Sequence, residues 1–155
     1  MTGYDRQTQG SGLEFVTLTV GGQSFCIDIM QVREIRRWSP VTLLPHAPAH
    51  VVGVINLRGA VIPIVDLAVK LDFPKIEATA REVIIIVGID ERIVGLLVES
   101  VSEIISVSPS DLRETPGGAE DATTAAIRGI IPLGNDMTKI IDLAALLPAT
   151  RDVAA

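Results

Sequence analysis

The sequence is poor in aromatic side chains, in cysteine and in positive charge. Aromatic residues make up 3% of the 155 residues, so we expect a core built from aliphatic side chains. The single cysteine, Cys26, excludes an internal disulfide and a zinc site built from several cysteines. The formal net charge of −6 argues against a nucleic-acid partner, because affinity for a phosphate backbone comes from clustered Lys and Arg.

Long hydrophobic runs are also missing. No purely apolar run exceeds five residues, whereas a membrane-spanning helix needs about 20. Residues 1–12 are polar and glycine-rich and lack the apolar stretch of a secretory signal. We therefore expect a cytoplasmic protein that does not insert into a membrane. Residues 1–12 and 149–155 are predicted to be tails, the first of them disordered.

β-Branched residues dominate what is present. Valine and isoleucine account for 36 of the 155 residues, which favours strands over helices. Apolar or alternating segments between turn residues predict strands at 14–20, 24–29, 51–57, 60–65, 82–89, 92–98, 128–133 and 137–141. Residues 32–36 fit either a strand or a short helix. Loops are expected at 39–48, which holds three prolines, and at 109–124.

Two parts of the sequence resemble each other. Residues 53–71 match residues 129–147 at a spacing of 76, with eight identities in 19 ungapped positions. A spacing of 69 aligns residues 32–35 with 101–104 and also superimposes two of the predicted hairpins. We therefore predict two similar small β units packed about a pseudo-two-fold axis, since neither could close a good core alone. A groove between the two units is the expected binding site.

Candidate catalytic groups are few and scattered. Cys26 lies between apolar neighbours in a predicted strand, where a buried and unreactive thiol is expected. His46 and His50 lie among prolines rather than on a helix, so they do not indicate a metal site. Asp66 and Asp142 each follow a predicted strand and precede a Leu-Ala pattern, which predicts caps of short helices. We expect no enzyme activity, no cofactor and no metal ion.

Arg58 stands at a predicted tight turn, beside Gly59. It is either a solvated turn residue or a recognition group, because a guanidinium pairs with carboxylates and backbone carbonyls. The repeat-equivalent residue is Gly134, so the fold does not require arginine there.

A second candidate patch consists of Val32, Glu34 and Ile35, with Trp38 nearby. The same residues fit an ordinary edge strand, and both readings remain open. An aliphatic groove flanked by Arg58 and Glu34 would suit the apolar face of an amphipathic partner helix.

Several segments together resemble a known family. They are Val32-Arg33-Glu34-Ile35, Val41-Thr42, Pro48-Ala49, the stretch from Gly53 to Gly59 that ends in Asn-Leu-Arg-Gly, Pro63-Ile64-Val65-Asp66-Leu67, and Val94 to Val101. In this order and spacing the sequence resembles the CheW family of chemotaxis coupling proteins over about residues 14–147. The stretch ending in Asn-Leu-Arg-Gly is the most specific part.

The resemblance implies an all-β fold of two SH3-like five-stranded barrels with short helices. One CheW-like domain would span residues 13–148, made of similar halves at about 13–75 and 80–148 that possibly exchange strands. It also implies a non-enzymatic adaptor between the cytoplasmic tips of chemoreceptors and the regulatory domain of the histidine kinase CheA, recruited to membrane-associated arrays. Residues for kinase contact are not assigned.

By the same resemblance, receptor helices would dock in the groove between the barrels. That groove would involve Val32, Glu34, Ile35, Asn56, Arg58, Gly95, Val101 and Ile104. Trp38 departs from the family pattern and would add apolar contact area beside the groove. The alternative is a small ligand-binding β-barrel protein that uses the same groove; it would need a few convergent polar groups, for which the sequence offers Arg58 and Glu34.

Overall fold

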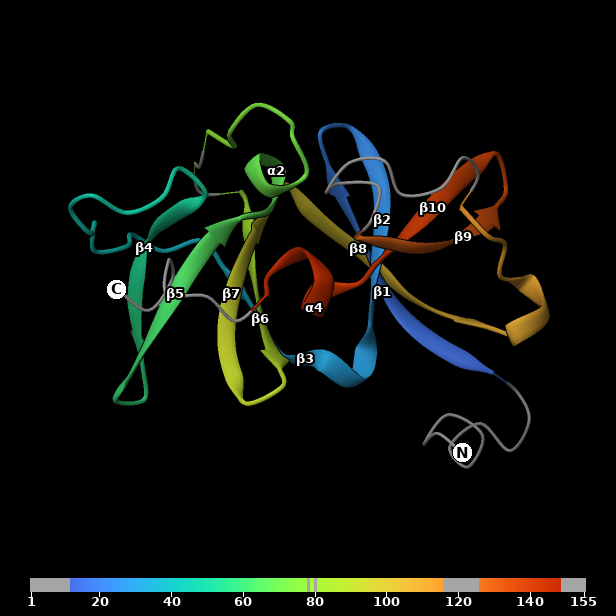
Figure 1. The fold of residues 1–155 in the computed structure, drawn as a ribbon, viewed down its shortest axis with the longest axis horizontal. Coiled ribbons are helices and arrows are strands. Elements are labelled where there is room, and N and C mark those ends of the chain that lie inside the picture. Colours follow the sequence, from blue (N-terminus) through green and yellow to red (C-terminus); the bar gives the residue numbers. More distant parts are fainter. Residues whose placement is uncertain (1–11, 78, 80, 116–125, 149–155) are drawn as a thin grey trace.

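The structure, a computed structural model, describes residues 12–77, 79, 81–115 and 126–148. Within these residues, strands form two five-stranded sheets (Figure 1). The strands are β1 (Leu13–Val20), β2 (Gln23–Asp28), β3 (Val32–Arg37), β4 (Val51–Leu57), β5 (Ala60–Asp66), β6 (Val83–Ile89), β7 (Arg92–Val98), β8 (Ser100–Val107), β9 (Ile127–Leu133) and β10 (Asp136–Ile141). The predicted tails, apart from Gly12, and residues 116–124 of the predicted 109–124 loop lie outside the described residues.

In the described part of the chain, four short helical turns accompany the strands, which confirms the predicted all-β class. They are the 3-10 turns η1 (Ile29–Gln31) and η2 (Pro109–Asp111) and the single-turn helices α2 (Leu67–Lys70) and α4 (Leu143–Leu146). Asp66 caps α2, because its carboxylate accepts hydrogen bonds from the backbone N–H groups of Ala68 and Val69. Asp142 caps α4 in the same way through Ala145. The predicted capping role of both aspartates is confirmed. In the part of the chain that the structure describes, no helix is long and apolar enough to cross a membrane.

The order of strands shows the internal repeat. The first sheet has the order β8-β1-β2-β10-β9 and the second has the order β3-β6-β7-β5-β4. In each sheet one hairpin pairs in parallel with a strand from another part of the chain: β10 with β2, and β5 with β7. The two sheets therefore follow the same plan and can be superimposed strand for strand.

Individual contacts repeat at the spacings found in the sequence. The isolated bridge between Thr42 and Val54 has its counterpart in the bridge between Arg113 and Ile130, 76 residues beyond Val54. The β3–β6 pair has an irregularity after Val32, and the β8–β1 pair has one at the equivalent place, beside Val101. Conservation of such irregular positions shows that the two sheets share geometry as well as order.

The sheets do not correspond to the two halves of the chain. β1 and β2 come from the N-terminal end but pair with β8 and β10, which lie beyond residue 99. The second sheet takes β3, β4 and β5 together with β6 and β7. The boundary expected near residues 75–80 therefore falls inside the second sheet, and the N-terminal hairpin is exchanged between the units.

Among the described residues, three clusters of buried hydrophobic side chains stabilise the sheets. The central cluster takes buried side chains from both sheets, for example Phe25 and Ile27 from the first and Ile85 and Leu96 from the second. Each sheet also has a cluster of its own: Ile131 and its neighbours in the first sheet, and Ile64 and its neighbours in the second. Because the central cluster is the largest of the three, burial of aliphatic surface joins the two units into one core.

Candidate functional site

The structure separates the eight residues predicted for the groove into three sets. Four are apolar residues of β3 and β8, two of which pack against the central cluster. Three are polar: one lies in β3, one at the end of β4 and one in the turn between β4 and β5. The last, Gly95, is buried. The sets are Val32, Ile35, Val101 and Ile104; Glu34, Asn56 and Arg58; and Gly95 alone.

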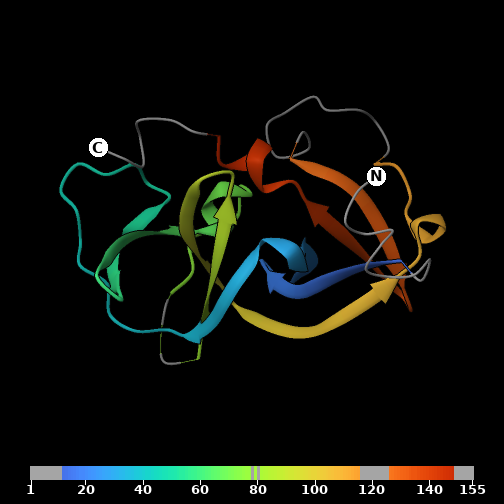
Figure 2. The same cartoon turned by 90° about the horizontal axis from the view of Figure 1, so that it is seen from below.

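The first set forms an apolar strip on two edge strands, which we call the valine–isoleucine strip. Val32 and Val101 are half-buried and pack against the central cluster. Ile35 and Ile104 remain 44% and 59% exposed. Figure 2 shows β3 (light blue) and β8 (gold) leaving the middle of the molecule in opposite directions. The strip therefore presents two repeat-related pairs of aliphatic side chains, one pair from each sheet.

Cross-strand pairing explains why Ile35 and Glu34 face opposite ways. Ile35 pairs with Ile85, which belongs to the central cluster, whereas Glu34 pairs with Ile86 of the second-sheet cluster. Paired residues on neighbouring strands share one face of a sheet. Ile35 and Glu34 therefore lie on opposite faces of β3, and the binding of a receptor helix at either face stays a prediction.

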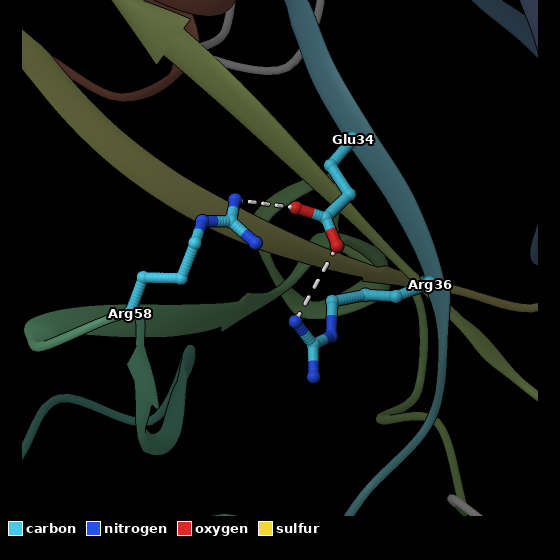
Figure 3. Close-up of polar contacts among 3 residues, drawn as sticks. All are labelled: Glu34, Arg36 and Arg58. Atoms are coloured by element: carbon cyan, nitrogen blue, oxygen red, sulfur yellow. Dashed lines mark hydrogen bonds and ion pairs between the residues drawn. The ribbon is translucent and has the colours of Figure 1, made fainter.

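Glu34 joins two arginines (Figure 3). Its carboxylate accepts a hydrogen bond from Arg58 Nη2 at 2.9 Å and lies 3.5 Å from Arg36 Nη1. The hydrogen bond from Arg58 and the charges of both arginines hold the pKa of Glu34 below its ordinary value. The Arg58 side chain is 74% exposed, so its guanidinium stays accessible to a partner. We call these three residues the Arg58 corner.

The local backbone sets the position of Arg58. Arg58 has φ of 53°, in the left-handed region that favours glycine, and its repeat-equivalent Gly134 has φ of 59°. Asn56 accepts a hydrogen bond from the Gly59 backbone N–H at 2.9 Å and so fastens the turn. In the structure Asn56 holds the turn that carries Arg58.

Gly95 does not line a surface. It is buried in β7, and a Cβ atom added there would lie 2.5 Å from Ile64 Cδ1. The absence of a side chain lets Ile64, Ile84 and Ile86 pack over this position. The expectation that Gly95 contributes to an open groove is corrected: its contribution is to core packing.

Trp38 also differs from expectation. Its side chain is half-buried and packs against the second-sheet cluster, together with Val41 and Val52. Its backbone N–H continues the β3–β6 ladder by donating to the Glu82 carbonyl at 3.0 Å. Part of the Trp38 surface is therefore used in packing against the second unit, and the rest stays exposed.

The groups considered for chemistry remain apart. Cys26 is fully buried, and burial raises the pKa of its thiol to about 12, which confirms the predicted buried thiol. Among the residues that the structure describes, no cluster of three or more His, Cys, Asp or Glu side chains could hold a metal ion. Asp66 and Asp142 are occupied as helix caps.

Two cavities were not anticipated from the sequence. One, of about 350 Å³, lies against the first-sheet cluster and is lined by Leu13, Phe15, Leu112, Arg113, Glu114, Arg128, Gly129 and Ile140. The other, of about 210 Å³, is lined by Gln23, Phe25, Leu71, Phe73, Thr115, Ile127, Ile130 and Lys139. Neither includes any of the eight predicted groove residues.

Comparison with known proteins identifies the family. A model of the CheW-like domain matches residues 14–151, nearly the whole chain. The chain belongs to the CheW-like domain family. The chemotaxis protein CheW of Rhizobium meliloti is 44% identical to it, with 100% of both chains covered. The chemotaxis protein CheW of Bacillus subtilis is 33% identical, with 88% of each chain covered.

A solved structure supports the same assignment for the fold. The crystal structure of the scaffolding protein TtCheW from Thermoanaerobacter tengcongensis is similar to this CheW-like domain, with a TM-score of 0.81 and 29% sequence identity. The likeness covers 90% of this chain and 94% of that one. Together with the two five-stranded sheets, it confirms the predicted fold of two SH3-like subdomains.

Proposed function

We propose that this protein is a non-enzymatic chemotaxis adaptor that couples the cytoplasmic tips of chemoreceptors to the histidine kinase CheA. The observation that carries the proposal is the end-to-end match to CheW proteins, in sequence over residues 14–151 and in fold. The protein would act in the cytoplasm, at membrane-associated receptor arrays. It would contribute binding surfaces and no chemistry of its own.

The valine–isoleucine strip and the Arg58 corner fit the receptor side of this proposal. A receptor tip is helical, and an amphipathic helix binds by placing apolar side chains on an aliphatic surface. Ile35 and Ile104 offer such a surface while they remain exposed. The Arg58 guanidinium, which reaches Glu34 on the other face of the same edge strand, would pair with a carboxylate or a backbone carbonyl of the helix and fix its register.

Coupling requires that receptor and kinase bind at the same time. A receptor can change kinase output through an adaptor only by a difference in binding free energy between its signalling states. Individual contacts can be weak, because sites linked in an array gain from effective concentration. The kinase should therefore bind away from the valine–isoleucine strip and the Arg58 corner.

Titration calorimetry tests the adaptor role. The full chain would be titrated with the CheA regulatory domain, with a receptor cytoplasmic-tip fragment, and with each in the presence of the other. We expect both to bind and neither to displace the other. Competition between the two partners would contradict coupling, and binding to neither by the folded chain would reject the proposal for these partners.

Arg58→Glu tests the receptor surface. Reversing the charge removes the hydrogen bond to Glu34 and places two carboxylates side by side. We expect a loss of affinity for the receptor fragment of at least tenfold, with CheA affinity and folding nearly unchanged. Arg81→Glu makes the same charge change at another exposed arginine and serves as the control. If Arg58→Glu unfolds the domain, Arg58 has a structural role instead.

A further inference from the structure

The 350 Å³ cavity of the first unit has the properties of a small-molecule site. Its volume falls within the range of about 300–1,000 Å³ typical of ligand pockets. Leu13, Phe15, Leu112 and Ile140 supply apolar walls. The charged groups of the lining are the guanidiniums of Arg113 and Arg128 and the carboxylate of Glu114, so positive charges outnumber negative ones there. An apolar pocket with a few charged groups at its edge is the usual form of a site for an amphipathic ligand.

Comparison of the two repeated units relates the cavity to the side chains that the first unit carries, not to the strand arrangement that both units share. At the equivalent place in the second unit, Trp38, Val41 and Val52 pack against the core. The counterpart of Trp38 at a spacing of 69 is Val107, and the counterpart of Val52 at a spacing of 76 is Arg128. Val41 precedes the bridge residue Thr42, and its counterpart is Leu112, which precedes the bridge residue Arg113. A smaller residue replaces tryptophan, and a charged residue replaces an apolar one.

The glycines at the two places show the same difference. A Cβ atom added at Gly53 would lie 2.5 Å from the Thr42 carbonyl oxygen, because the loop closes tightly over the second unit. At the equivalent Gly129 the nearest atom would be the Arg113 carbonyl oxygen at 3.3 Å. Both covering segments are hydrogen-bonded to their sheets at 2.8–2.9 Å, so the extra space over Gly129 is local, and the cavity lies beside it.

Arg128 is placed to bind an anion. Its side chain is 45% exposed, and its ion pair with the buried Asp28 spans 3.8 Å. Charge-assisted hydrogen bonds between these groups are ordinarily about 2.7–2.9 Å long. Arg113, by contrast, donates from Nη1 to the Ser110 and Leu112 carbonyls at 2.9 and 3.2 Å. Arg113 is thus engaged by its own loop, whereas the long contact with Asp28 leaves Arg128 N–H groups that a ligand in the cavity can bind.

We propose that this cavity binds a small molecule with an apolar body and a single carboxylate. The apolar body would lie between Phe15, Leu112 and Ile140, and the carboxylate would pair with Arg128. The site lies away from the valine–isoleucine strip and the Arg58 corner, so the proposal does not depend on the adaptor role.

Ligand-observed NMR on the full chain tests the site with two matched probes. These are 3-phenylpropionate and 3-phenylpropan-1-ol, which share an apolar body and differ in the carboxylate. We expect the acid to bind about tenfold more tightly, the ratio that one charge-assisted hydrogen bond provides. Equal binding of the two probes, or binding of neither at millimolar concentration, would overturn the proposal.

Three variants locate the binding. Arg128→Met keeps an unbranched apolar stem, and we expect it to abolish the preference for the acid. Gly129→Ala adds a methyl group to the cavity wall, and we expect it to weaken both probes severalfold. Arg81→Met makes the same charge change at an arginine that does not line the cavity, and binding should not change. An acid preference that survives Arg128→Met, or unchanged affinity for both probes in Gly129→Ala, would place the ligand elsewhere.

Discussion

Arg58 combines an exposed guanidinium with a backbone conformation that L-residues rarely adopt. Its φ of 53° matches that of Gly134 at the repeat-equivalent turn. The left-handed conformation costs a non-glycine residue about 1 kcal/mol. Since the second turn of the same kind uses glycine, the fold itself does not need a side chain at this position. Retention of an unfavourable residue at an exposed turn is typical of a functional position.

The variant Arg58→Gly separates the two roles of this residue. Glycine relieves the left-handed strain of about 1 kcal/mol, so urea unfolding should show unchanged or slightly higher stability. The affinity for a receptor fragment should fall, because the guanidinium is lost. A large loss of stability would contradict this interpretation.

The same variant should change the ionisation of Glu34. Loss of the Arg58 hydrogen bond should let the pKa of Glu34 rise toward its ordinary value. When the pKa of a carboxyl is lower in the folded state than in the unfolded state, its ionisation stabilises the folded protein at any pH above the unfolded pKa. That stabilisation is lost as the pH falls through the folded-state pKa. The wild-type chain should therefore lose the contribution of Glu34 in acid, and the variant should lack it. A carboxyl ¹³C NMR titration of both proteins measures the shift, and an identical pKa in both would contradict the assigned cause.

Cys26 gives a prediction of the opposite sign. Burial raises the pKa of its thiol from 9.0 to about 12, so the folded state holds the proton that the unfolded state releases. The stabilisation is complete below pH 9 and is lost progressively as the pH rises from about 9 toward 12. At pH 8 a thiol reagent should label the chain at a rate that follows unfolding. Rapid labelling of the native protein would show that the thiol is accessible.

At the scale of elements, the two repeat-equivalent glycines beneath the bridged segments differ in the space above them. Gly53 lies under the Thr42 carbonyl in β4, and its counterpart Gly129 in β9 has more space. We expect Gly53→Ala to destabilise the protein by about 1–3 kcal/mol, because a backbone segment has to move. Gly129→Ala should cost less than half as much. Denaturant unfolding of the pair measures both, and equal losses would show that the covering segments are equally adaptable.

At the scale of the whole molecule, the central cluster joins the two units. It contains side chains from both sheets and from the helices α2 and α4 that follow the repeated hairpins. The chain also crosses between the two sheets more than once. It forms β1 and β2 in the first sheet, continues into β3 to β7 of the second, and returns to the first for β8 to β10. Both features favour unfolding of the two units in a single step.

Ile131→Ala tests this cooperativity. Ile131 is fully buried in the first-sheet cluster, so its truncation should cost about 2–5 kcal/mol. Trp38, the single tryptophan, packs in the second unit and reports on that unit by fluorescence. We expect the Trp38 transition to shift with the substitution and to coincide with the transition seen by circular dichroism. Ile85→Ala in the central cluster should cost a similar amount and serves as the comparison. An unchanged Trp38 midpoint in Ile131→Ala would show that the units unfold separately.

The sequence by itself determined the class of fold, the repeat and most element boundaries. Alternating β-branched runs predict strands because side chains on a pleated sheet alternate between a buried and an exposed face. Asp66 and Asp142 predicted the ends of strands, since a short acidic side chain can accept the free N–H groups of a helix. These features depend on near neighbours in the chain, so they can be read locally.

Tertiary structure decided which strands pair and which side chains share a surface. Exchange of β1 and β2 between the units depends on burial in the central cluster, which no local pattern encodes. Gly95 was expected at a groove but is buried in the core, and Trp38, expected beside the groove, is half-buried against the second-sheet cluster. The surroundings of both residues come from strands distant in sequence. The Arg58 corner joins residues 24 positions apart in the chain, and the cavity at Arg128 joins four separate segments. Such juxtapositions are set by packing between elements that are distant in the sequence, so no local sequence pattern predicts them.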